Sequence, residues 1–255
     1  MSDLTLILNT AEKHVQFAFV DGNDVLCAET WLAQKGGTEI LVPALSEACH
    51  RMDRSITDVS RIACVAGPGN FTGLRIGLTT AAGLSRALHA KQAGMDYLQC
   101  VAANIHGKPG EDILVLTKAR SGLAYSAHFL TAADGAPRKI GSTMLVAVNA
   151  LSDSDIGYAS YIIGSAVTIP DFRIGSLQFS TASSTGILAM PSISSLLTCA
   201  ARINWSMTGY ADIAPLYLRD CDAVENLEEL VTKQGRTPSI ARHELQYLTT
   251  KSLES

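Results

Sequence analysis

Residues 63–88, ACVAGPGNFTGLRIGLTTAAGLSRAL, decide the fold, because this stretch has the pattern of a buried strand, a glycine-rich turn and a helix. Residues 61–66 form a short apolar run before Gly67 and Pro68, which is typical of a strand buried on both faces. Residues 73–88 lack proline and carry leucine and alanine at helical spacing. The pattern predicts a helix there.

The turn between these two elements has the sequence GPGNFTG, and it is a candidate anion site. A helix that begins on a glycine-rich turn directs free backbone N–H groups and a positive dipole end at one point. Both formal phosphate motifs fail, because no lysine follows Gly73 and no glycine stands at position 72. A purely structural turn is therefore an equal alternative. The candidate anion-facing residues are Gly67, Gly69, Asn70, Thr72 and Gly73, with Thr72 also the expected helix cap.

The predicted helix also carries a stripe of small residues at every fourth position, with Thr80 beside it. The stripe consists of Gly73, Gly77, Ala81 and Ser85. A stripe without bulky side chains lets another helix approach closely. Packing on the chain's own core is the alternative, and composition alone favours it slightly.

The composition indicates an intracellular protein that does not bind nucleic acid directly. The 255 residues carry a formal charge of −4, whereas unaided nucleic-acid binding usually needs a basic surface. The six cysteines are scattered and form no C-x-x-C pair, which favours reduced thiols over disulfides or zinc. The sequence shows no membrane-spanning run or signal peptide, so we expect a soluble cytoplasmic protein.

The order of elements predicts two related α/β halves. Three strands at 4–8, 14–20 and 25–33 are joined by tight turns, and a helix at 38–54 precedes the strand and helix described above. A breaker cluster at 106–110 separates these from a second series of strands. The expected domains are residues 1–106, residues 107–220, and a polar, partly disordered tail at 221–255.

With these elements placed, the sequence resembles the TsaB (YeaZ) family. Residues 67–77, GPGNFTGLRIG, are close to that family's pattern GPGSFTG(L/V)RIG, with Asn70 where serine is usual. Weaker matches follow in the right order and extend the resemblance over about residues 4–220. They are Thr10 with Ala11, residues 119–122 with Tyr125, and residues 215–219.

The resemblance implies the fold of actin, Hsp70 and sugar kinases, in which two ribonuclease H-like halves surround a cleft. It also implies a non-catalytic relative of TsaD, the transferase that makes threonylcarbamoyladenosine in tRNA. Family members pair with TsaD through the first domain's two helices, which here would be 38–54 and 73–88. The expected interface residues are Leu41, Leu45, Ala48, Gly73, Gly77, Thr80, Ala81 and Ser85.

Further partners follow from the same resemblance. It implies a TsaE-like ATPase as a second partner, contact with tRNA only through the complex, and no membrane. A homodimer through the same helices stays open. We expect no tightly bound cofactor and no metal in this chain, although ATP or ADP can enter the complex.

Three departures from the family pattern argue against ATP hydrolysis by this chain. Asn9 stands where the family has aspartate, Gly37 where it has histidine, and Lys118 where it has aspartate. A neutral amide is a poor ligand for a divalent cation. Two alternatives to the scaffold role are a nucleotide-binding enzyme of the same fold and a glycoprotease. The second is disfavoured, because the chain has no H-x-x-x-H pair and no G-x-S-x-G motif. We assign no catalytic residue.

Overall fold

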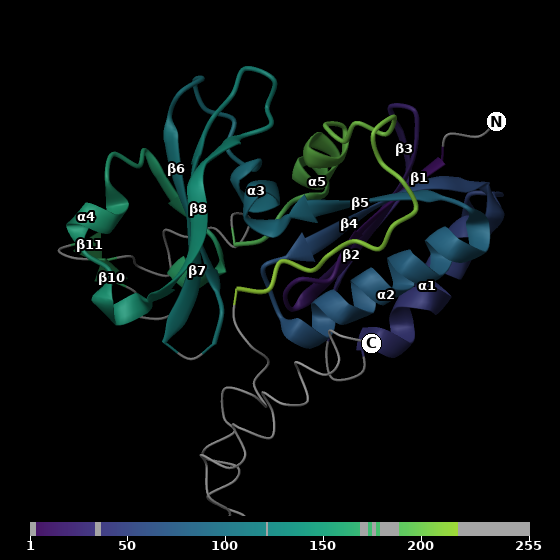
Figure 1. Cartoon of the computed structure of the whole chain (residues 1–255), viewed down its shortest axis with the longest axis horizontal. Coiled ribbons are helices and arrows are strands. Elements are labelled where there is room, and N and C mark those ends of the chain that lie inside the picture. Colours follow the sequence, from purple (N-terminus) through teal and green to yellow (C-terminus); the bar gives the residue numbers. More distant parts are fainter. Residues whose placement is uncertain are drawn as a thin grey trace, which may run out of the picture. The chain divides into compact units, whose positions relative to one another are not determined.

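The computed structural model describes residues 4–33, 37–120, 122–168, 173–174, 177–178 and 189–218. The chain divides into two units, Met1–Leu216 and Tyr217–Ser255. Everything below concerns the first unit, which contains two main sheets (Figure 1). The tail expected at 221–255 lies outside the described residues.

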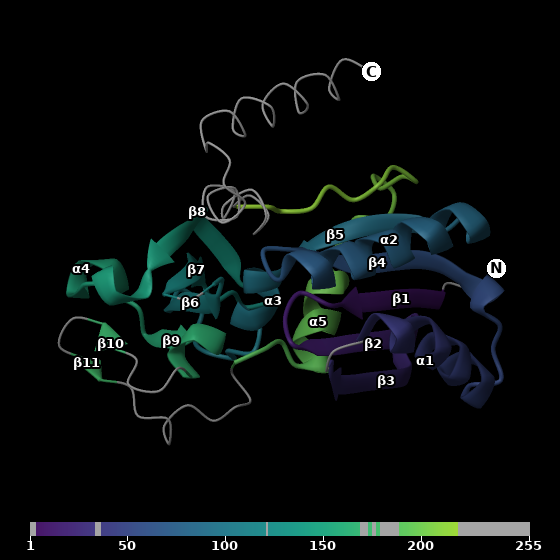
Figure 2. The same ribbon diagram turned by 90° about the horizontal axis from the view of Figure 1, so that it is seen from below.

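The first sheet has five strands in the order β3-β2-β1-β4-β5 (Figure 2). Strands β1 (Leu4–Asn9), β2 (His14–Asp21) and β3 (Asp24–Leu32) form the predicted antiparallel meander. Strands β4 (Val59–Gly67) and β5 (Lys91–Asp96) run parallel to β1. The sequence patterns missed β5, because its residues KQAGMD are short of β-branched and aromatic side chains.

The second sheet repeats this arrangement in the order β8-β7-β6-β9. Strands β6 (Asp112–Lys118), β7 (Leu123–Leu130) and β8 (Arg138–Ala147) are antiparallel, and β9 (Tyr161–Ile163) is parallel to β6. An antiparallel meander followed by a parallel strand therefore occurs twice. This duplication confirms the predicted ribonuclease H-like, actin-type α/β fold with two related halves.

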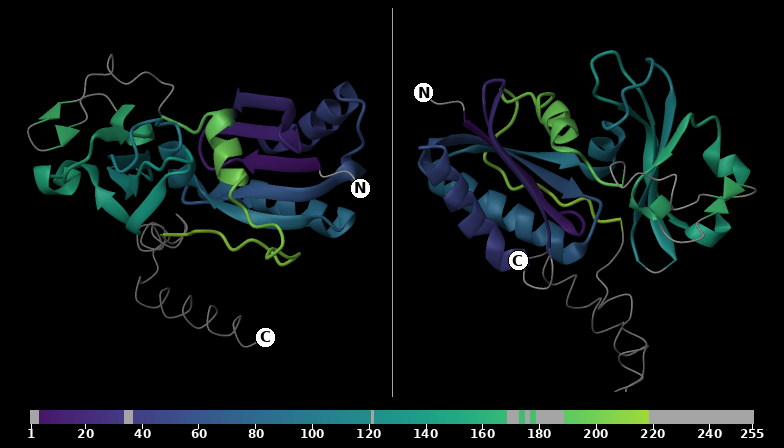
Figure 3. Two further views of the ribbon diagram at one scale, coloured as in Figure 1. Left: turned by 90° about the horizontal axis from the view of Figure 1, so that it is seen from above. Right: turned by 180° about the vertical axis from the view of Figure 1, so that it is seen from behind.

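Helices cover both faces of the first sheet. Helices α1 (Gly37–Arg51) and α2 (Phe71–Leu88) lie on one face, and α5 (Ile193–Ala200) crosses the other (Figures 1 and 3). The alternate side chains of β1 explain the two cores, because Leu6 and Leu8 pack toward α1 while Ile7 packs with the α3 and α5 residues. Burial on both faces accounts for the continuous apolar run that predicted β4.

The remaining elements are short. They are η1 (Ile56–Asp58), α3 (Tyr97–Ala102), η2 (Val148–Ala150), α4 (Asp153–Ile156), η3 (Ser165–Thr168), β10 (Arg173–Ile174) and β11 (Leu177–Gln178). Asp96 caps α3, since its carboxylate accepts hydrogen bonds from the Leu98 and Gln99 amides. None of the described helices is long and apolar enough to cross a membrane.

The described chain returns to the first sheet after the second one. Helix α5 packs on α3, β1 and β2. The segment after it bonds to two strands of the first sheet. The backbone amide of Gln92 in the edge strand β5 donates to the Gly209 carbonyl at 3.1 Å, and the Leu216 amide donates to the Ala66 carbonyl of β4 at 2.8 Å. The expected boundary at 106/107 falls between α3 and β6, and it stays a prediction.

Candidate functional site

The glycine-rich turn is held by contacts within the chain. Asn70, and not the expected Thr72, caps α2, because its Oδ1 accepts a hydrogen bond from the Gly73 amide at 2.9 Å. Thr72 is exposed. The Asn70 amide in turn donates to the Ala11 carbonyl at 2.6 Å. The amide side chain at position 70 therefore does the capping that the sequence pattern assigned to the Thr72 hydroxyl.

Close packing against the β1–β2 turn explains the glycines. A Cβ atom on Gly69 would overlap the Ala11 carbonyl oxygen, and one on Gly73 would overlap the Thr10 carbonyl oxygen. Gly67 has a φ of 119°, which side-chain-bearing residues rarely adopt. Two of the amides that would bind a phosphate already donate within the chain. The glycine-rich turn is therefore better suited to packing against the β1–β2 turn than to binding an anion.

Asn9 belongs to a buried hydrogen-bond network and is 2% exposed. Its Nδ2 donates to Gln16 Oε1 at 2.7 Å, and its Oδ1 accepts from the Ala11 amide at 3.1 Å. Gln16 Nε2 continues the network to the Pro191 carbonyl at 2.9 Å. Both polar atoms of Asn9 are thus engaged, so this side chain does not fit the role of a metal ligand. Sequence analysis missed Gln16, although a glutamine at an inward position of β2 was a signal.

A second polar contact crosses from one half to the other. The Ser165 hydroxyl, at the start of η3, donates to Glu12 Oε1 at 2.6 Å and accepts from the Lys118 amide at 2.8 Å. The Tyr97 hydroxyl also bonds to Glu12. Burial raises the pKa of Glu12 despite these bonds, and burial together with the neighbouring Glu12 raises the pKa of Tyr97. The glycine-rich turn bonded to Ala11 and the fully engaged Asn9 therefore do not fit a magnesium nucleotide.

The small-residue stripe of α2 is internal, which corrects the predicted interface. Gly77, Ala81 and Ser85 are buried, and a Cβ on Gly77 would overlap Thr10 Oγ1 and lie 3.5 Å from Cys64 Sγ. The Ser85 hydroxyl donates to the Ala90 carbonyl at 2.7 Å. The stripe therefore lets α2 approach the chain's own sheet.

The residues expected on α1 are internal as well. Leu41, Leu45 and Ala48 are at most 2% exposed and belong to the core under the first sheet. Gly73 is partly buried against Thr10. Thr80 is partly exposed and is the main member of the predicted interface set that reaches the outer surface. Of the predicted set, Leu45 and Thr80 line a hollow on the outward side of the two helices, and its other lining residues were not predicted.

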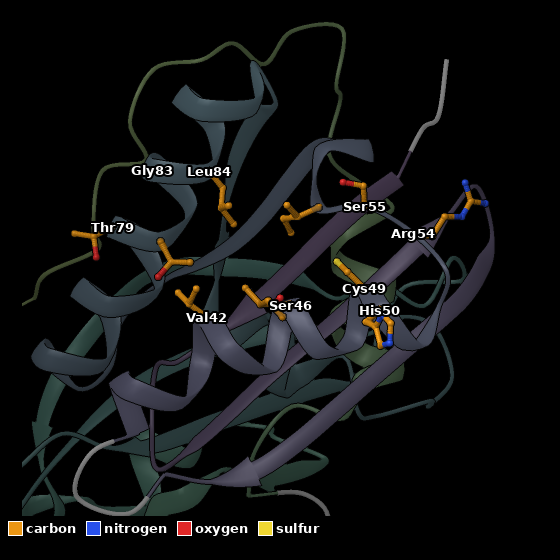
Figure 4. Close-up of a pocket in the computed structure, with 12 residues that line it drawn as sticks. Val42, Ser46, Cys49, His50, Arg54, Ser55, Thr79, Gly83 and Leu84 are labelled. Carbon is orange, nitrogen blue, oxygen red and sulfur yellow. The ribbon is translucent and has the colours of Figure 1, made fainter.

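A groove of about 670 Å³ lies on that outward side, between α1 and α2 (Figure 4). Val42 from α1 and Leu84 from α2 face it, together with Thr79 and Gly83. Val42 is 60% exposed and the neighbouring Ile40 is 49% exposed. His50 and Arg54 stand at one end. This surface is mostly apolar, as is common at protein–protein contacts.

Fold and site together define an actin-type domain whose glycine-rich turn packs against its own β1–β2 turn and whose helix pair carries an exposed apolar groove. The family model of TsaD, tRNA N6-adenosine threonylcarbamoyltransferase, matches residues 31–154. The chain is a TsaB-like protein.

Three known proteins illustrate this relationship. An uncharacterised protein of Mycobacterium tuberculosis is 30% identical over 220 residues, 86% of this chain and 92% of that protein. The tRNA threonylcarbamoyladenosine biosynthesis protein TsaB of Escherichia coli is 30% identical over 99 residues, 38% of this chain and 43% of that protein. The solved structure of YeaZ from Pseudomonas aeruginosa shares the fold, with a TM-score of 0.69 at 20% identity over 86% of this chain and all of that one.

Proposed function

We propose that this chain is a non-catalytic partner subunit in tRNA threonylcarbamoyladenosine biosynthesis, and that it binds a TsaD-type transferase through the outward side of α1 and α2. The observation that carries the proposal is the exposed apolar groove between these helices. Several relatives are named for this pathway. Burying an apolar groove against a partner removes its surface from water, which favours association.

The kind of partner follows from the range of the TsaD match. Residues 31–154 include both α1 and α2, so a TsaD-type protein has helices that correspond to them. Two related subunits can then place equivalent helix pairs against each other about an approximate twofold axis. The groove on this chain accepts the ridge of side chains that the partner's helices present.

The polar groups around Asn9 and the glycine-rich turn support assigning the chemistry to the partner. Asn9 is fully engaged within the chain, and the Asn70 and Gly73 amides of the turn already donate within it. Any ATP or ADP in the complex then binds elsewhere. A TsaE-like ATPase as second partner, indirect contact with tRNA, a cytoplasmic location and self-association through α1 and α2 stay predictions.

Variants at the groove test the docking surface. Val42→Glu adds a charge to its rim, and Gly83→Arg fills it with a side chain whose Cβ meets open space in the monomer. Ile140→Glu is the matched control, because Ile140 is 44% exposed on β8 of the second sheet. Affinity for the TsaD-type subunit from the same cell is measured by titration calorimetry, and thermal unfolding checks each fold.

We expect each groove variant to weaken binding by about tenfold or more, because a buried unpaired charge costs well over 1 kcal/mol. Ile140→Glu should bind as the unchanged chain does. Equal affinity for all four proteins would exclude this surface as the docking site. A TsaD-type subunit that binds none of them would contradict the proposed partner.

A further inference from the structure

One hydrophobic core continues from the first sheet into the second through two helices. Leu98 and Val101 of α3 are fully buried and share a cluster with Ile7 of the first sheet and Ile113 of the second. Leu196 of α5 is fully buried in the same cluster. Helix α3 contacts β4 and β5 of the first sheet and β6 and β7 of the second, and α5 contacts α3, β1 and β2. The two halves therefore share apolar side chains instead of meeting at two separate surfaces.

The segment that joins β7 to β8 reaches back from the second sheet to α3. Lys139 Nζ lies 2.7 Å from Asp96 Oδ2, and the carbonyl of Pro137 accepts a hydrogen bond from Gln99 Nε2 at 2.8 Å. The side chains of Asp96 and Lys139 are 17% and 29% exposed, so water and salt screen this ion pair less than a surface pair. Because Asp96 also caps α3, the ion pair joins β8 to the start of that helix.

The same segment also reaches the end of α5. Arg202, two residues after α5, forms an ion pair with the Asp134 carboxylate, and its guanidinium donates to the Asp134 carbonyl at 3.3 Å. Residues 134–139, which we call the clasp, thus bond to both helices of the shared core.

We propose that α3, α5 and the clasp form a rigid joint, which holds the two halves at one fixed angle and makes them unfold as one unit. Two halves of a chain are expected to move relative to each other unless the interface between them is large and hydrophobic. Here a hinge opening would expose Leu98 and Leu196 to water and would break the contacts of the clasp. The compact unit Met1–Leu216 contains both halves, as a rigid joint requires.

The joint is separate from the proposed docking surface. Helix α5 crosses the face of the first sheet opposite α1 and α2 (Figure 3). Neither Lys139 nor Arg202 lines the groove between α1 and α2, so variants of the clasp leave the groove unchanged. The whole chain without any partner is therefore the right sample, and the result does not depend on whether the docking proposal holds.

Native-state hydrogen exchange in increasing urea tests whether the halves are one unit. Strands β1 and β6 lie inside the first and the second sheet. In one unit their slowest amides exchange only through global unfolding, so we expect the same free energy of opening and the same urea dependence in both strands. A difference of about tenfold or more between the exchange rates of the two strands, with different urea dependences, would show two separate units and overturn the joint.

Two variants test the clasp in the same experiment. Lys139→Met and Arg202→Met each remove one ion pair, and Arg86→Met is the matched control because it removes the ion pair with Asp212 on another surface. We expect exchange to rise by about two- to fivefold at the amides of α3 in Lys139→Met and of α5 in Arg202→Met, the factor for one partly exposed ion pair. Arg86→Met should leave both helices unchanged. Unchanged exchange in both clasp variants would exclude the clasp from the joint.

Double electron–electron resonance tests the fixed angle. Glu47→p-acetylphenylalanine on α1 and Ser142→p-acetylphenylalanine on β8 together carry two spin labels, since both positions are exposed on regular elements of different halves. Thermal unfolding checks that the labelled chain keeps its fold. We expect one narrow distribution of distances between the labels. Two separate distances, or one broad distribution, would show a hinge and overturn the fixed angle.

Discussion

Replacing Gly73 by alanine tests whether the small-residue stripe of α2 is internal. Gly73 has a helical backbone, so the substitution brings no backbone strain. The new Cβ would overlap the carbonyl oxygen of Thr10, which is backbone and cannot rotate away. It would also lie 3.7 Å from Asn70 Oδ1, in ordinary contact with the cap. Either α2 or the β1–β2 turn must therefore shift.

The magnitude follows from two opposing effects. Overpacking a well-packed contact costs about 1–3 kcal/mol. Alanine recovers at most about 1 kcal/mol through its better helix propensity. The net loss of about 1–2 kcal/mol corresponds to a Tm lower by roughly 2–8 °C in a chain of this size. If the stripe faced outward, the same substitution would raise the Tm.

Gly83 supplies the matched control on the same helix. It is exposed, and a Cβ there meets open space, so Gly83→Ala should gain about 0.5–1 kcal/mol and raise the Tm by a few degrees. Differential scanning calorimetry of the two variants and the unchanged chain measures both shifts. A Gly73→Ala variant at least as stable as the unchanged chain would refute the packing argument.

One further variant tests the buried Asn9, and one labelling experiment tests the buried Cys64. Asn9→Asp should lower the free energy of unfolding at pH 7 by about 1–3 kcal/mol, because the new carboxylate would face Gln16 Oε1 without a donor. Urea unfolding measures this loss, and an unchanged midpoint would contradict the hydrogen-bond network around Asn9. Burial raises the pKa of the Cys64 thiol to about 12. Iodoacetamide at pH 8 should therefore leave Cys64 unlabelled in the native chain, while the partly exposed Cys27 reacts. Peptide mass spectrometry measures the labelling of both. Equal labelling of the two thiols would show that Cys64 is accessible.

The sequence determined the local elements and the family. Apolar patterning predicted β1, β2 and β4, and the turn residues predicted the hairpin at Gly22. The run GPGNFTGLRIG indicated the TsaB family from the sequence alone. These features are readable because each depends on neighbours within a few positions. The patterns missed β5 because its residues KQAGMD carry few β-branched or aromatic side chains, and Gly94 lies against Ala66 and Ile213 of other segments.

The tertiary structure alone decided which side of each helix is free. A period of four residues shows that Gly73, Gly77 and Ala81 share a face, but it does not distinguish a face packed on the chain's own sheet from one kept for a partner. Thr10 and Cys64 occupy that face, and the exposed groove lies elsewhere on the same helices. Likewise, the contact of Glu12 with Ser165 joins residues 153 positions apart, and no local pattern records such a distance. Helical and strand periods describe which residues point the same way, whereas chain folding determines what they meet.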